Sequence, residues 1–184
     1  MQDRKLTVVV DISADTEDSE PPSSEAIHQW IALTLSKYES LAEALFPASE
    51  IRVSVNFATL QEITELNHQF RDKNYPTNVL AFPDSIFLPD TNELQLGDIA
   101  ICGDIVRQEA LVQNKPPIAH WAHMVIHATL HLLGYNHIIH DEAVQMENVE
   151  IALLAELGYL NPYHLTSELI PNYFAPLPYE NAEG

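Results

Sequence analysis

The sequence predicts a single domain of the α+β class, in which a four-stranded mixed β-sheet packs with about five helices. Short runs with a strand pattern alternate with longer runs of helical periodicity along the 184 residues. Hydrophobic residues make up 46% of the chain and charged residues 19%, which is typical of a globular protein with a buried core. We expect the domain to span residues 1–163 and a proline-rich C-terminal tail to cover 164–184.

Four segments have the pattern of β-strands. The segment 51–57 alternates apolar and polar residues, so one side of this strand should face the core. The other three segments are short and mainly apolar, and they cover 6–12, 78–82 and 96–102. The proline-containing stretch 85–94 is expected to be a loop, and so is the acidic stretch 13–25.

Five segments have helical periodicity or helix-end signals, and the expected helices cover 25–45, 60–71, 104–114, 118–133 and 141–157. Ser24 and Thr59 are the expected N-caps of the first two helices, because a hydroxyl can accept a hydrogen bond from an N–H group of the first turn. Gly134 and Gly158 should end the last two helices, because glycine adopts a positive φ readily.

The cysteine count and the apolar runs indicate the cellular compartment in which we expect the protein. The single cysteine, Cys102, excludes an internal disulfide and is typical of a reducing compartment. The N-terminal apolar run is too short for a signal peptide, and no stretch of about 18 apolar residues is present to form a membrane-spanning helix. We therefore expect a cytoplasmic protein with no membrane association.

The formal net charge of the chain is −19, from 27 acidic and 8 basic residues. All basic residues lie at or before Lys115, so the last 69 residues carry none. Broad, salt-driven binding to nucleic acid needs many Lys and Arg side chains, and this composition argues against it. A nucleic-acid site on this chain would have to be a local one.

Six of the nine histidines fall in the segment 120–142. His127 and His131 are four residues apart in an expected helix, so both side chains lie on one face and can offer nitrogens to the same point. Such a pair is weak evidence alone, but Gly134 can reverse the chain and let His137 supply a third nitrogen. The pattern "HATLHLLGYNH" therefore predicts one Zn²⁺ per chain, held by three ligands with a fourth position for water, as in catalytic zinc sites. Nickel also accepts imidazole and stays open as an alternative.

His120 and His123 lie upstream of His127 on nearly the same side of the expected helix. A ligand, a proton relay or a substrate contact are the functional interpretations. We favour partly buried side chains with backbone partners, because three ligands already suffice. Zinc peptidases of the H-E-x-x-H type carry a glutamate general base directly after the first histidine, whereas Ala128 stands there in this chain.

Further motifs resemble the YbeY family of bacterial endoribonucleases. Besides "HATLHLLGYNH", the resemblance rests on "FRDKNYPTNVLAFP" (70–83), "LGDIAIC" (96–102) and "HWAHMVIH" (120–127), and it covers most of residues 50–163. It implies a zincin-like metal helix and a zinc-dependent endoribonuclease for single-stranded RNA, acting in ribosomal RNA maturation and ribosome quality control.

The resemblance also implies roles for individual residues. His127, His131 and His137 match the zinc ligands of the family, and Arg71 matches an arginine that the family uses for activity. A guanidinium presents a rigid fork of donors that suits a phosphodiester and its developing charge. The expected RNA site is thus a local basic pocket formed by Arg71, Lys73 and the ion.

Three functions stay open on these grounds. The first is the endoribonuclease, with Arg52 and Arg107 as further candidates for the basic pocket and a ribosomal or ribosome-associated protein as a partner. The second is a non-catalytic ribosome-assembly factor with a structural zinc. It is favoured by the negative charge and by Asn136, which replaces an aspartate of the family and cannot accept a proton. The third is another metal-dependent hydrolase, and Ala128 argues against a peptidase.

Overall fold

The computed structural model describes residues 7–14, 21–37, 48–135 and 140–164. These residues form four strands and five helices, which confirms the predicted α+β class. In chain order the elements are β1 (Thr7–Ala14), α1 (Ser24–Ser36), β2 (Glu50–Phe57), α3 (Leu60–Arg71), β3 (Val79–Leu88), β4 (Glu93–Ile101), α4 (Gly103–Val112), α5 (Pro117–Leu132) and α6 (His140–Glu156).

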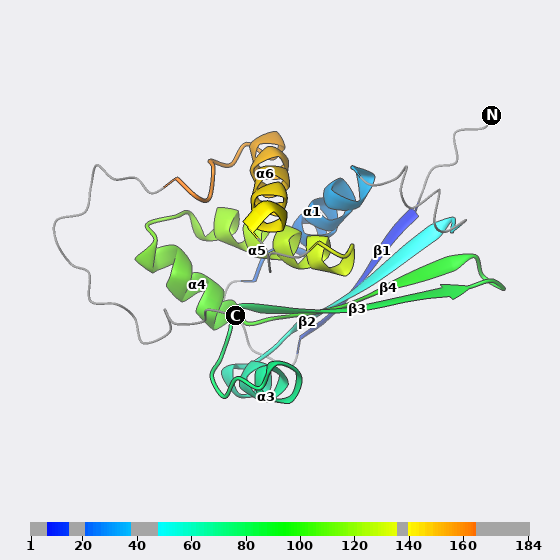
Figure 1. Cartoon of the computed structure of the whole chain (residues 1–184), viewed down its shortest axis with the longest axis horizontal. Helices are drawn as coiled ribbons and strands as arrows, with labels where there is room; N and C mark the ends of the chain where they lie inside the picture. Colours follow the sequence, from blue (N-terminus) through cyan, green and yellow to red (C-terminus); the bar gives the residue numbers. More distant parts are fainter. Residues whose placement is uncertain (1–6, 15–20, 38–47, 136–139, 165–184) are drawn as a thin grey trace.

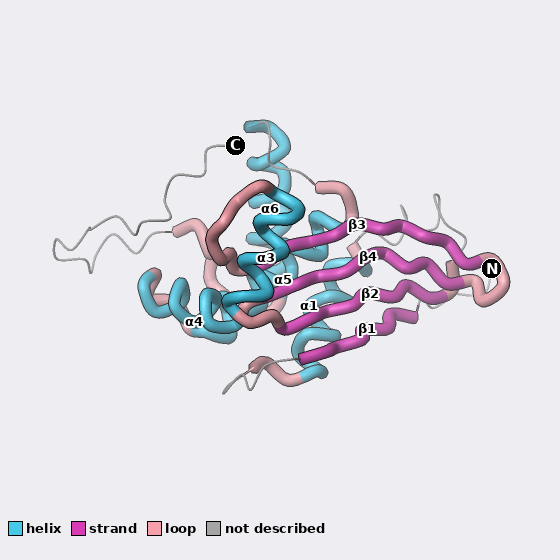
Figure 2. The backbone as a smooth tube through the Cα atoms, turned by 90° about the horizontal axis from the view of Figure 1, so that it is seen from below, coloured by secondary structure: helices cyan, strands magenta, loops and turns pink. Residues whose placement is uncertain are grey.

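The four strands form one mixed sheet in the order β1-β2-β4-β3 (Figure 2). β1 and β4 both pair parallel with β2, whereas β3 pairs antiparallel with β4 and forms an edge of the sheet. The parallel pairs require crossover connections, and α1 supplies the one between β1 and β2. The expected four-stranded mixed sheet is therefore confirmed.

Helices α1, α5 and α6 cover one face of the sheet, and α3 lies on the opposite face (Figure 1). The alternation predicted for β2 is confirmed, because every second residue of the strand is buried. The buried residues of β2 join those of α1 and α5 in the main core, whereas a smaller cluster with Ile63 of α3 lies on the other face. All described elements thus pack around a single sheet.

Helix α5 lies at the centre of the helical layer, with contacts to α1, α4, α6 and the sheet. Trp121 of α5 meets Phe57 of β2 edge to face, with ring centroids 5.7 Å apart. Gly97 of β4 lets the end of this helix approach the sheet. A Cβ there would lie 2.3 Å from the Phe82 carbonyl oxygen and 3.0 Å from Leu132. The φ of +144° at Gly97 is also one that other residues rarely adopt.

The loop prediction for 85–94 is wrong, because β3 runs on to Leu88 and β4 already begins at Glu93. The two strands form a hairpin in which Phe87 pairs with Leu94. Pro89 indicated the loop, and it does lie in the short turn between the two strands. Pro83 lies within β3, which is an edge strand, where a missing N–H need not break the ladder. A register shift between Pro83 and Ile86 accommodates the irregularity.

Several expected element ends differ from the structure. Ser23, not Ser24, caps α1, and its hydroxyl oxygen accepts from the Ala26 N–H at 3.2 Å. α1 ends at Ser36, and residues 38–47 lie outside the described part of the chain, so the expected end at 45 is not tested. The stretch 13–25 contributes its first two residues to β1 and its last two to α1. The tail from 165 onward also lies outside the described residues.

No helix in the described ranges is both long enough and apolar enough to cross a membrane.

Candidate active site

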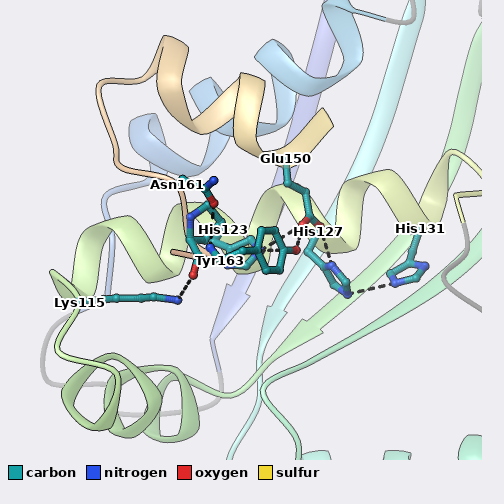
Figure 3. A network of polar contacts seen from close by, with 8 residues as sticks. Lys115, His123, His127, His131, Glu150, Asn161 and Tyr163 are labelled. Atoms are coloured by element: carbon teal, nitrogen blue, oxygen red, sulfur yellow. Dashed lines mark hydrogen bonds and ion pairs between the residues drawn. The ribbon is translucent and has the colours of Figure 1, made fainter. Parts of the chain in front are cut away.

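Helix α5 places His127 and His131 on one face, as their spacing predicts (Figure 3). Their Nε2 atoms lie 3.1 Å apart, and the two ring centroids are separated by 4.6 Å. The His127 side chain keeps 25% of its surface exposed, so this end of the pair is accessible from solvent. The structure thus brings two of the three predicted metal ligands together.

The ring of His127 is held from behind by Glu150 of α6. Oε1 of Glu150 accepts a hydrogen bond from Nδ1 of His127 at 2.7 Å, and the Glu150 side chain is completely buried. Oε2 accepts from Nε2 of His123 at 3.2 Å and from the hydroxyl of Tyr163. Burial raises the pKa of Glu150, but the hydrogen bonds from His123 and His127 outweigh it and bring the pKa to about 2. Glu150 is therefore an ionised carboxylate at neutral pH.

The ring of His131 is held by the backbone at the end of its own helix. Nδ1 of His131 donates to the carbonyl oxygen of Tyr135 at 2.8 Å. Gly134 turns the chain with φ +91°, which allows the Tyr135 N–H to donate back to the Leu130 carbonyl at 3.0 Å. The predicted helix-ending role of Gly134 is confirmed, and the turn also supplies the acceptor that orients His131.

These two hydrogen bonds determine which ring nitrogens carry protons. A carboxylate and a carbonyl only accept, so Nδ1 of both histidines is the donor and each neutral ring has its lone pair on Nε2. Two lone pairs that face each other at 3.1 Å repel, unless a cation lies between them. Ligand nitrogens about 3.3 Å apart are expected around a tetrahedral ion with bonds of 2.0–2.1 Å. The donor set and its spacing therefore fit a metal ion such as zinc.

The third predicted ligand, His137, lies outside the described residues, as does Asn136. Within the described ranges, no three His, Cys, Asp or Glu side chains are grouped closely enough to hold a metal. The three-histidine site therefore stays a prediction, with two of its members placed.

His120 and His123 are both buried, with exposed fractions of 3% and 7%. Their partners are carboxylates and not the backbone groups that we expected. Nε2 of His120 binds Glu109 of α4 at 2.8 Å, and Nε2 of His123 binds Glu150. Burial lowers the pKa of His123, although Glu150 opposes this effect, so the ring favours the neutral form.

Sequence reasoning missed Glu109, Glu150 and Tyr163 as parts of this network. Glu109 also accepts from the side-chain amide of Asn78, at 3.1 and 3.2 Å. Because Glu109 binds His120 as well, it connects the "PTNVLAFP" motif to α5. A signal for Glu150 was present in the sequence. It occupies a core position of α6, four residues after buried Met146 and four before buried Leu154. A lone acid at such a position needs buried partners.

Arg71 is the exposed last residue of α3, and α3 lies on the face of the sheet opposite α5 (Figure 1). Asp72 ends the helix in the left-handed conformation, with φ 60°, and Lys73 follows. No hydrogen bond or ion pair joins Arg71 to His127 or His131 in the described part of the structure. Phe70 beside it is 54% exposed and contacts Phe82 edge to face at 5.0 Å.

The other two arginines suggested for a basic pocket are engaged with acids. Arg52 binds three carboxylates at 2.7 to 3.1 Å, those of Asp11, Glu50 and Glu93. Asp11 and Glu93 raise the pKa of Arg52, led by the hydrogen bond to Asp11. Arg107 binds Asp104 at 2.6 Å. Neither arginine therefore offers a free positive charge for RNA.

Comparisons with known proteins agree with this architecture. The family model described as Endoribonuclease YbeY matches residues 11–158. The proteins named "Endoribonuclease YbeY" from Cellvibrio japonicus and Idiomarina loihiensis are 43% and 44% identical to the chain. These matches cover 91% and 80% of this chain and 90% and 86% of the relatives. A third, from Colwellia psychrerythraea, is 40% identical over 84% of this chain and 96% of its own length.

A solved structure shares the fold. The solution structure of TM1509 from Thermotoga maritima matches with a TM-score of 0.50 and 25% identity, over 81% of this chain and 89% of that one. Together with the family model over residues 11–158 and relatives above 40% identity, this confirms the resemblance found in the motifs. The chain belongs to the endoribonuclease YbeY family.

Proposed function

We propose that this protein is a metal-dependent endoribonuclease that cleaves single-stranded RNA during ribosomal RNA maturation and ribosome quality control. Membership of a family named for its endoribonuclease activity supports an enzyme over a non-catalytic assembly factor. The observation that carries the metal dependence is the pair of Nε2 atoms that face each other at 3.1 Å while both Nδ1 atoms are engaged by acceptors.

We assign His127, His131 and His137 as the ligands of one Zn²⁺ ion, with nickel as a substitute that imidazole also accepts. The two described ligands come from successive turns of a helix with a fully buried core side, so their positions are fixed before an ion arrives. When bound, the ion supplies Lewis acidity and a water of lowered pKa. The protein's part is to present the histidine nitrogens unprotonated, which Glu150 and the Tyr135 carbonyl do.

Arg71 is the proposed phosphate-binding residue, assisted by Lys73. Neither side chain forms an ion pair with a described residue, in contrast to Arg52 and Arg107. A guanidinium can donate two parallel hydrogen bonds to a phosphate and stabilise charge that develops on it. Exposed Phe70 next to these cations adds an aromatic face on which a base could stack.

A protein partner on the ribosome and a cytoplasmic location complete the proposal. The strongly negative chain offers few cations, so the free protein should bind naked RNA weakly. A ribosomal or ribosome-associated protein that holds the substrate nearby would offset this weakness.

A peptidase receives no support from the site. Ala128, which stands where zinc peptidases carry their glutamate base, is completely buried. A glutamate at this position would therefore point into the core and not toward a bound substrate.

Metal analysis of the purified protein, paired with an RNA cleavage assay before and after chelation, tests the proposal. We expect about one zinc or nickel per chain and loss of cleavage on chelation, with recovery when zinc is returned. Arg71→Ala should lose cleavage and keep its metal, whereas Lys37→Ala, whose lysine pairs with Glu156 on another surface, should cleave normally. A metal-free preparation that cleaves RNA at the full rate would refute the metal dependence.

The chemistry of the cut ends identifies the attacking group. A 2′,3′-cyclic phosphate with a 5′-hydroxyl on the other fragment would assign the attack to the RNA 2′-hydroxyl, whereas a 5′-phosphate with a 3′-hydroxyl would assign it to water. Cleavage of a peptide panel without cleavage of RNA would contradict the endoribonuclease itself.

A further inference from the structure

We infer that Glu150 is the positioning residue of the site: its Oε1 fixes His127 in the tautomer and ring orientation that leave Nε2 available to a metal ion. This inference rests on the proposed function, because it concerns the same metal site. It adds a residue of α6, 23 positions away in the sequence, that the histidine motif does not contain.

The first step is the direction of the hydrogen bond. Nδ1 of His127 and Oε1 of Glu150 are 2.7 Å apart, a short distance typical of a bond to an ionised acceptor. The Glu150 side chain has no exposed surface, so it cannot swing toward solvent and release the ring. The contact therefore selects the Nδ1–H form of His127 and opposes rotation of the ring.

The second step is that Glu150 is itself held in place. Its other oxygen, Oε2, accepts from His123 and Tyr163, so Oε1 is left to His127 (Figure 3). Tyr163 is anchored in turn, because its N–H donates to Oδ1 of Asn161 at 2.9 Å and the adjacent carbonyl of Pro162 accepts from Lys115 at 2.6 Å. The segment after α6 thus locks the carboxylate that orients the helix-α5 histidine.

The third step is that an uncharged side chain of the same shape cannot replace Glu150. A glutamine offers one acceptor oxygen and one NH₂ donor, whereas all three partners of Glu150 donate. If the amide oxygen faces His127, the NH₂ group meets the donors of His123 and Tyr163. If the glutamine amide takes the opposite orientation, its NH₂ group donates to Nδ1 of His127. This contact favours the tautomer with the proton on Nε2, and a protonated Nε2 cannot bind a metal.

Nitrogen NMR of the histidine rings in the metal-free full-length protein tests the tautomer directly. We expect His127 to carry its proton on Nδ1 in the wild type and to shift toward Nε2 protonation in Glu150→Gln. Zinc affinity, measured by competition with a chromophoric chelator, should fall about 10- to 100-fold in that variant, as for other residues that orient a ligand.

Glu147→Gln is the matched control. Glu147 lies one turn earlier on α6 and is exposed, so the substitution removes the same charge from the same helix without touching His127. It should retain the wild-type tautomer and zinc affinity. An equal fall in affinity for both variants would assign the effect to net charge and overturn the inference.

Two further measurements keep the inference testable if Glu150→Gln fails to fold. The wild-type tautomer needs no variant, and a proton on Nε2 of metal-free His127 would overturn the inference outright. Glu150→Asp keeps the charge but has a shorter side chain, so its zinc affinity should lie between those of the wild type and Glu150→Gln. An unchanged, wild-type affinity in Glu150→Asp would contradict the inference. A wild-type protein that has the Nδ1–H tautomer but binds no zinc would sink the proposed function and leave the positioning of the ring intact.

Discussion

At the scale of single residues, Gly134 connects backbone conformation to the orientation of His131. Its φ of +91° lets Tyr135 turn back, so that the Tyr135 N–H closes the end of α5 and its carbonyl accepts from His131. A Cβ at this position would meet no atom within 4 Å. Any penalty for a larger residue therefore comes from the backbone conformation and not from crowding.

Gly134→Ala should lower the free energy of unfolding by about 1–2 kcal/mol, because an L-residue is strained at positive φ. It should also weaken zinc binding, because a shifted Tyr135 carbonyl no longer holds the His131 ring. Urea unfolding and chelator competition measure the two effects. Gly158→Ala is the control, since Gly158 ends α6 with φ +82° and also has no neighbour within 4 Å. Both variants should lose similar stability, and a loss of zinc affinity in both would contradict the link to His131.

At the scale of elements, α5 serves both the core and the site. Apart from its first turn, almost every residue of the helix is buried, including Val125, Ile126 and Leu130. A helix packed on so many sides has little freedom to shift, which keeps the His127–His131 spacing constant. The site is therefore only as stable as the packing of this helix.

Leu130→Ala should destabilise the protein by about 2–5 kcal/mol, because Leu130 is completely buried and its loss leaves a cavity. Leu111→Ala on α4 removes the same atoms from a side chain that is 82% exposed, and it should change stability by less than about 0.5 kcal/mol. The midpoints and slopes of urea unfolding curves compare the two. Equal effects would mean that α5 is not the packed centre that the structure shows.

The N-terminus of α3 has a capping box formed by Thr59 and Glu62. The Thr59 N–H and hydroxyl both donate to the Glu62 carboxylate, at 2.7 and 2.8 Å, and lower its pKa from the ordinary 4.5. Because the folded pKa is the lower one, the contribution to stability is complete above the unfolded value and is lost as the pH falls through the folded value. The relevant pH window therefore lies below 4.5.

Carbon NMR titration of the Glu62 carboxyl should show a pKa below 4.5 in the wild type. In Thr59→Ala the side-chain donor is lost, so the pKa should move back toward its ordinary value. Thr59→Ala should also cost about 1 kcal/mol at neutral pH, and less below pH 4. A Glu62 pKa at or above 4.5 in the wild type would refute the cap.

At the scale of the whole molecule, the charge of −19 governs how RNA can approach. Arg71 and Lys73 are near neighbours in sequence and form no ion pair with a described residue, whereas Arg52 is surrounded by three carboxylates. In the proposed function, these two cations are the ones among the described residues that attract RNA. The number of phosphates that the protein neutralises should be correspondingly small.

Filter binding to an uncleavable single-stranded oligonucleotide at several salt concentrations measures that number. Two cations predict a slope of about −1.4 for the logarithm of affinity against the logarithm of salt concentration. Arg71→Ala and Lys73→Ala should each reduce the slope by about 0.7, whereas Lys37→Ala should leave it unchanged. A wild-type slope steeper than about −3 would show that further cations take part.

How far the sequence predicts this molecule depends on the sequence distance between interacting residues. His127, His131 and Gly134 are neighbours within three turns, so helical geometry alone placed them correctly. Glu150 was not predicted because its hydrogen bond to His127 joins two different helices. Its core position in α6 was the one sequence feature that indicated a buried role. The β3–β4 hairpin was missed because Pro89 is a loop signal that does not show how far the strands on either side of the turn extend.

The burial of α5 has a consequence for the order in which parts of the protein open. Backbone amides in its central turns, such as those of Val125 and Leu130, should exchange with deuterium only when the whole domain unfolds. A bound ion should slow this exchange further, because it binds the folded protein and so raises the free energy of global unfolding. Catalytic segments usually exchange early, and here the ligand-bearing helix should be among the last to take up deuterium.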